Sequence, residues 1–165
     1  MESFGALHPQ IVHTPIVMLI FSALFAIVGR LMDRDWLRKT SVILLVFGFL
    51  GAFAAVRSGT ITHETPEKKQ GVPEHDIDAH EEMAQMTLWV SGAALVAVAA
   101  ASRMTGGAAN ALAGLALLLQ IAAAILVGIT GYRGGHLVFD HGAGVRIGGK
   151  LVHDVPHPDE ANEGK

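Results

Sequence analysis

The sequence predicts an all-α membrane protein in which four transmembrane helices form an up-down-up-down bundle with both termini outside. The composition is strongly apolar, and the apolar residues gather into separate runs. Of the 165 residues, 51% are hydrophobic and 16% are charged, and the mean hydropathy is +0.43. These values are typical of a membrane protein rather than a soluble one. The formal net charge of −3 argues against nucleic acid as a partner.

Each apolar run is close to the length that crosses a bilayer, because about 20 mostly apolar residues cover roughly 30 Å of hydrocarbon. The second run is short, and it is extended by the snorkelling side chains at its ends. The second and fourth runs lack the polar face that a helix in a soluble bundle would show. The predicted spans are about 11–32, 40–57, 80–102 and 108–131. They make up one transmembrane domain, 1–146, followed by a polar tail, 147–165.

The connections predict the orientation in the membrane. The first and third connections are short and carry most of the basic residues near the spans: Arg30, Arg34, Arg38, Lys39 and Arg103. Basic residues favour the cytoplasmic side, so both termini and the long middle connection face outward. We therefore expect a multi-pass protein of the bacterial inner membrane whose outer side faces the periplasm. The N-terminus lacks the features of a signal peptide, so the first span is expected to be retained as an anchor.

Histidine is the unusual residue of this chain. All of its copies fall on the predicted outer side: His8, His13, His63, His75, His80, His136, His141, His153 and His157. An imidazole is comfortable at a membrane interface, so those in polar segments need no special role. Four of them instead come from the ends of spans one, three and four: His13, His80, His136 and His141. Polar groups at that depth need partners, which favours a shared site.

The spacing of the histidines limits how they can face. His8 and His13, His75 and His80, and His136 and His141 are each five positions apart. On a helix, five residues advance about 140° beyond one full turn. We therefore expect one member of each pair to point into the bundle while the other caps a helix, supports a ligand or meets solvent.

Several cofactors suit an imidazole site, and the sequence leaves the choice open. Haem b needs two axial imidazoles and a flat space, which Gly131 and Gly135, four apart on one helix face, would provide; Arg57 and Arg133 would pair with its propionates. These glycines equally suit helix packing, and the arginines equally suit interface anchoring. Copper, zinc or non-haem iron would use histidine with a carboxylate such as Glu64, Glu81, Glu82 or Asp140. The chain contains no cysteine, which excludes thiolate ligands, and it contains no hydrolase or P-loop motif.

Two stretches, "LHPQIVHTPIVMLI" and "GYRGGHLVFDHGAGV", resemble the signature stretches of a bacterial four-span membrane family known as domain of unknown function 2231. The matching positions of the first are Leu7, His8, Pro9, Val12, His13, Pro15 and Ile16. Those of the second are Gly131, Gly134, Gly135, Leu137, Val138, His141, Gly142, Gly144 and Val145.

The resemblance covers nearly the whole chain and implies a four-helix membrane domain. It makes His141 a signature position and His136 a variable one. The middle connection is longer and more charged than is usual in the family, so no role is carried over to His63 or His75. Some relatives look fused to Rieske or cytochrome c modules, which implies a part in respiratory electron transfer.

The leading hypothesis is a membrane-bound b-type cytochrome with one haem near the outer face, held by two of His13, His80, His136 and His141. The first choice is His13 with His80, and His8 is a further candidate. Such a protein would pass electrons between the quinone pool, or a larger membrane redox complex, and an outer acceptor such as a periplasmic cytochrome. The alternatives are a cofactor-free accessory subunit of a larger complex or homo-oligomer, and a copper or zinc site. Whether the protein is an enzyme stays open.

Overall fold

The structure is a computed structural model that describes residues 7–63, 72–147 and 150–152. Its helices are α2 (His8–Ile11), α3 (His13–Leu31), α4 (Asp35–His63), α5 (Glu74–Ala101) and α6 (Gly106–Phe139). Two short strands, β1 (Arg146–Ile147) and β2 (Lys150–Leu151), pair antiparallel after α6.

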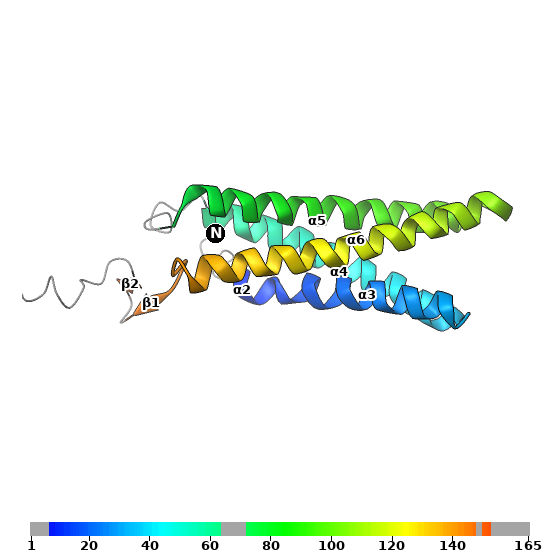
Figure 1. Cartoon of the computed structure of the whole chain (residues 1–165), viewed down its shortest axis with the longest axis horizontal. Coiled ribbons are helices and arrows are strands. Elements are labelled where there is room, and N and C mark those ends of the chain that lie inside the picture. The colour runs from blue at the N-terminus through cyan, green and yellow to red at the C-terminus, as the bar shows by residue number, and fades with distance from the viewer. Residues whose placement is uncertain (1–6, 64–71, 148–149, 153–165) are drawn as a thin grey trace, which may run out of the picture.

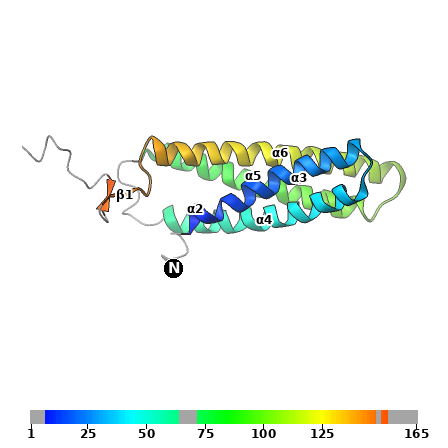
Figure 2. The same ribbon diagram turned by 90° about the horizontal axis from the view of Figure 1, so that it is seen from below.

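The long helices run side by side along one axis (Figure 1). Consecutive long helices are joined at alternating ends of the bundle, so each runs antiparallel to the one before it (Figures 1 and 2). The most extensive contacts lie within two hairpins, α3 with α4 and α5 with α6, and the hairpins meet where α3 touches α6 and α4 touches α5. Helix α2 precedes α3 and contacts α4.

The helices are long and apolar enough to cross a membrane. The candidate spans are His8–Leu31, Asp35–Thr60, Glu74–Ala101 and Gly106–Phe139. Large apolar side chains point away from the bundle, among them Trp89, Val96 and Leu118, which are 74%, 69% and 66% exposed. Hydrocarbon covers such side chains, and a helix satisfies its own backbone there. The prediction of an all-α protein with four membrane-spanning helices is therefore confirmed.

An apolar cluster and a set of polar contacts hold the helices together in the middle of the bundle. Leu19, Leu45, Ala94 and Val127 form a buried cluster with one residue from each long helix. Close by in the chain, the hydroxyl of Ser22 lies 2.9 Å from the carbonyl oxygen of Ser41 and 2.9 Å from Oε1 of Gln120. This hydroxyl links α3, α4 and α6, as polar side chains commonly do between membrane helices.

At one end the helices extend beyond the predicted spans. Helix α6 continues through the glycine-rich stretch to Phe139, and α5 begins at Glu74. Glycine is tolerated inside a membrane helix because neighbouring helices support it. Pro73 is the N-cap of α5, and Glu74 and Asp76 lie in its first turn. Acidic side chains there interact favourably with the positive end of the helix dipole. Helical walls therefore reach past the apolar runs at this end.

Candidate metal centre

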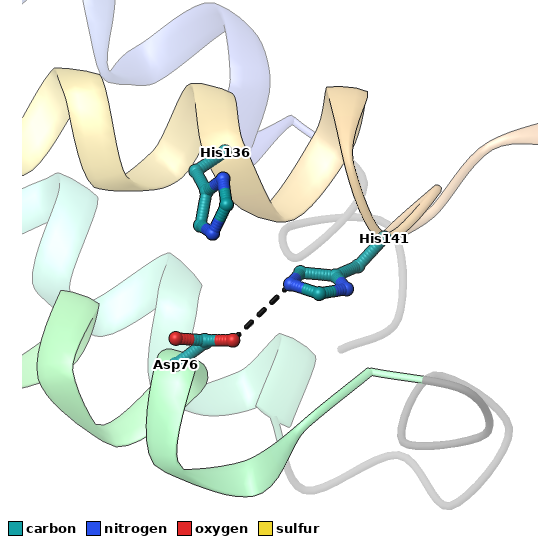
Figure 3. Close-up of side chains that lie close together, drawn as sticks. All are labelled: Asp76, His136 and His141. Carbon is teal, nitrogen blue, oxygen red and sulfur yellow. Dashed lines mark ion pairs between the residues drawn. The ribbon is translucent and has the colours of Figure 1, made fainter.

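Several histidine-bearing helix ends meet at one end of the bundle. These are α2 with the start of α3, the end of α4, the start of α5 and the end of α6 (Figure 1). Three side chains converge there: Asp76, His136 and His141. One carboxylate oxygen and one nitrogen from each imidazole lie within 4.8 Å of one another. Figure 3 shows Asp76 on α5 facing both rings.

The end of α6 explains how two histidines five residues apart come together. His136 lies in the last turn of the helix. The chain then turns back at Gly142, whose φ is +62°, a left-handed conformation that glycine adopts at little cost. The N–H of Ala143 donates to the carbonyl oxygen of Leu137 at 2.9 Å. His141 therefore folds against the helix end, and the centroids of the His136 and His141 rings lie 5.1 Å apart.

For His136 and His141 alone, this geometry differs from the expectation that the members of each histidine pair face different ways. The estimate of about 140° assumes an unbroken helix, and α6 ends at Phe139. The turn after Phe139 replaces the helical advance and brings the second ring back beside the first.

Asp140 orients the ring of His136. Its carboxylate is hydrogen-bonded to Nδ1 of His136. Because a carboxylate only accepts, Nδ1 carries a proton, and in the neutral ring Nε2 keeps its lone pair. The ring points toward Asp76 and His141 (Figure 3). A carboxylate behind an imidazole in this way is the usual support of a metal-binding histidine.

Asp76 and His141 form the more enclosed side of the centre. Nε2 of His141 lies 3.1 Å from Oδ2 of Asp76, and the two side chains are 24% and 22% exposed. On its other side, Oδ1 of Asp76 lies 3.2 Å from Nε2 of His75, whose side chain is 82% exposed. The Asp76 carboxylate is thus held between two imidazoles.

The three ligand atoms are close to the spacing that one metal ion requires. Metal–nitrogen and metal–oxygen bonds of about 2.0–2.2 Å place two ligands of one ion no more than roughly 4 Å apart. The three ligand atoms lie within 4.8 Å of one another, so they must approach by less than about 1 Å to bind one ion. Rotation of the side chains can provide this movement. Two histidines with one carboxylate are a ligand set of catalytic zinc and non-haem iron sites.

His80 is used differently. Its Nδ1 lies 3.1 Å from the carbonyl oxygen of Thr130 on α6, so this nitrogen donates. Its ring lies on Gly134, where an added Cβ would be 3.0 Å from the ring carbon Cε1. One signature glycine therefore makes room for a histidine of the neighbouring helix.

His8 repeats this arrangement between α2 and α4. Its Nδ1 lies 2.8 Å from Oγ of Ser58, and a Cβ on Gly59 would be 3.2 Å from its Cε1. The Ser58 hydroxyl donates its proton to the carbonyl oxygen of Ala55, so His8 is the donor to Ser58. His80 thus joins α5 to α6, and His8 joins α2 to α4.

His13 is exposed and its Nδ1 donates to the carbonyl oxygen of Pro9 at 2.7 Å. The first-choice haem pair, His13 with His80, therefore consists of one ring on the bundle surface and one between α5 and α6. Its ligand role stays a prediction.

The other residues predicted for the site, the glycines and arginines among them, lie outside the cluster of Asp76, His136 and His141. A Cβ on Gly131 would be 3.5 Å from Ile16 of α3, whereas one on Gly135 would meet only Phe139, at 4.0 Å, among the described residues. Arg57 is exposed and Arg133 half-buried. The side chain of His63 and the whole of Glu64, His153 and His157 lie outside the part of the chain that is described.

Sequence reasoning missed Asp76, because the segment before His80 has the composition of a polar connection. A signal was present in "PEHDIDAH". A proline followed by acidic residues favours a helix start, and Asp76 stands four positions before His80, on the same helix face.

Comparison with known proteins gives the family. No curated protein and no solved structure matches the chain. The family model described as "Predicted membrane protein (DUF2231)" matches residues 5–146, a range that includes both signature stretches and all three residues of the candidate metal centre. The chain therefore belongs to this family of predicted membrane proteins, domain of unknown function 2231.

Proposed function

We propose that this multi-pass membrane protein binds one transition-metal ion at its histidine-rich end through Asp76, His136 and His141. The observation that carries the proposal is the convergence of one oxygen and two imidazole nitrogens within 4.8 Å. Asp140 behind His136 supports it, since a metal-binding imidazole is usually held by such a group.

The ligand atoms limit which metal ions the centre can bind. Imidazole suits zinc, copper and iron, whereas magnesium and calcium prefer oxygen ligands alone. Three protein ligands leave coordination positions for water or another molecule. Copper or iron at this position would serve electron transfer. Some relatives look fused to Rieske or cytochrome c modules, which supports that role. Zinc would not change oxidation state.

We place the centre on the periplasmic face of the bacterial inner membrane. The opposite end carries the basic residues Arg34, in the connection between α3 and α4, and Arg38 and Lys39, near the start of α4. Such residues favour the cytoplasm. A redox partner would then be a periplasmic cytochrome, a larger membrane complex or a second copy of the chain.

Haem b is the second candidate function, and His80 favours it. Because its Nδ1 donates to Thr130, its Nε2 keeps the lone pair that an axial ligand needs. The Nδ1–H of His13 donates to the carbonyl oxygen of Pro9 in the same way. The haem candidate and the metal centre thus use different residues, and single substitutions separate them.

The test is metal analysis and a visible spectrum of the protein, purified in detergent without a polyhistidine tag. We expect one equivalent of zinc, copper or iron per chain and no Soret band. His141→Ala and Asp76→Ala should lose the metal, and His13→Ala should retain it. A Soret band that disappears in His13→Ala or His80→Ala would establish haem instead. Protein with neither metal nor haem, even after incubation with each metal, would indicate a cofactor-free accessory subunit.

A further inference from the structure

We infer that a groove beside the metal centre binds the ring head group of a quinol from the bilayer. This inference rests on the proposed function, since one wall of the groove is the metal-binding His136. The groove has a volume of about 310 Å³ and is lined by Tyr132, Gly135, His136, Phe139 and Asp140. Ligand sites commonly measure about 300–1,000 Å³, so the groove suits a single ring rather than a large molecule.

Two aromatic side chains form its apolar walls. Tyr132 and Phe139 are seven residues apart on α6, which places them on one face of the helix. They are 79% and 87% exposed although both are large and apolar. Gly135 lies between them, and the space above it is open, with Phe139 the nearest described neighbour at 4.0 Å. A flat ring can therefore lie on the helix backbone between two aromatic rings.

The groove faces outward from the bundle on the surface of a candidate span. It lies at the histidine-rich end of a candidate span, on residues exposed at the surface of the bundle. Tyrosine is enriched where lipid head groups meet the hydrocarbon. A ligand with an apolar tail can keep that tail in the bilayer while its head group enters the groove.

The polar wall selects the head group. The His136 Nδ1 proton is already donated to Asp140, so this wall offers a carboxylate with further acceptor positions. A hydroxyl of the ligand can donate to it, whereas the oxygen of a quinone cannot. The negative charge of Asp140 also repels the phosphate of an anionic phospholipid. A neutral ring that carries hydroxyl groups, a quinol, is the lipid-soluble ligand that fits both walls.

Gly135→Leu tests the groove without disturbing the bundle. The new side chain would enter open space, whereas the same change at Gly128 provides the matched control. Gly128 lies seven residues earlier on the same helix face, and a Cβ there meets no described atom within 4 Å. Binding of decylubiquinol and of decylubiquinone is measured by calorimetry on metal-loaded protein in nanodiscs, and the metal content is determined on the same samples.

We expect wild type and Gly128→Leu to bind decylubiquinol equally and more tightly than decylubiquinone. Gly135→Leu should bind at least about tenfold more weakly, because a filled pocket rejects its ligand. Unchanged binding in Gly135→Leu, or tighter binding of the quinone form, overturns the inference. So does a co-purified phospholipid that is present in wild type and absent in Gly135→Leu. Metal without quinol binding would refute the groove alone, and quinol binding without metal would refute the proposed metal centre alone.

Discussion

Two groups of histidines lie at the same end of the bundle and differ in what their rings meet. His8 and His80 each rest on a glycine of the neighbouring helix and donate from Nδ1 to an oxygen there. His136 and His141 instead converge on the carboxylate of Asp76. The first group joins neighbouring helices, α2 to α4 and α5 to α6, and the second forms the candidate metal centre.

The difference shows that what faces a histidine decides its role more than its depth does. A glycine on the facing helix leaves room for an imidazole and brings backbone or hydroxyl oxygen within reach of it. A carboxylate on the facing helix presents an acceptor that a metal ion can share. The two groups therefore predict separate effects: loss of metal from the second and loss of stability from the first.

The largest effect is expected from Asp76→Ala. This change removes a direct ligand, so the metal affinity should fall by more than the roughly 10–100-fold that is typical of an outer-shell partner. A competition titration with a chromophoric chelator measures it, and circular dichroism checks the fold. His75→Ala, one residue away, is the control and should lose far less. Equal losses in both variants would contradict the assignment of Asp76.

Asp140→Asn should weaken metal binding by about 10–100-fold, because the amide no longer holds the His136 ring with a carboxylate. The same titration measures this change. Asp78→Asn introduces the same chemistry at an exposed position on α5 and should leave the affinity unchanged. If both variants behave as wild type, Asp140 has no part in the centre.

Gly134→Ala should act on the other group. An added Cβ lies 3.0 Å from Cε1 of His80, and forcing such a contact costs about 1–3 kcal/mol of unfolding free energy. Reversible unfolding in mixed micelles measures it, with Gly114→Ala, where nothing lies within 4 Å among the described residues, as the control. The penalty should shrink in the double variant with His80→Ala. A penalty that persists there would mean that the glycine does not serve His80.

Ser58→Ala should have the smallest effect. It removes the 2.8 Å hydrogen bond from His8, which is worth about 0.5–1.5 kcal/mol. The same unfolding assay applies, and the metal content should not change. A loss of metal in this variant would erase the distinction between the two groups.

The sequence predicted four membrane-spanning helices because bilayer thickness sets the length of an apolar span, and the described residues form four helices that are long and apolar enough. It also predicted that His136 and His141 lie at the histidine-rich end. It did not predict that they meet, because that depends on where α6 ends and on the turn at Gly142. Asp76 was missed because polar residues before an apolar run resemble a loop. The contact of His80 with Gly134 joins residues far apart in the chain, and no local pattern reports it.

X-ray absorption at the edge of the bound metal tests the central claim most directly. The wild-type protein should show a shell of nitrogen and oxygen ligands at about 2.0–2.2 Å, with the outer-shell scattering of two imidazoles. His136→Ala, reloaded with metal, should lose the scattering of one imidazole, and His80→Ala should retain both. The multiple scattering of a porphyrin, or imidazole scattering that falls in His80→Ala and not in His136→Ala, would contradict the account.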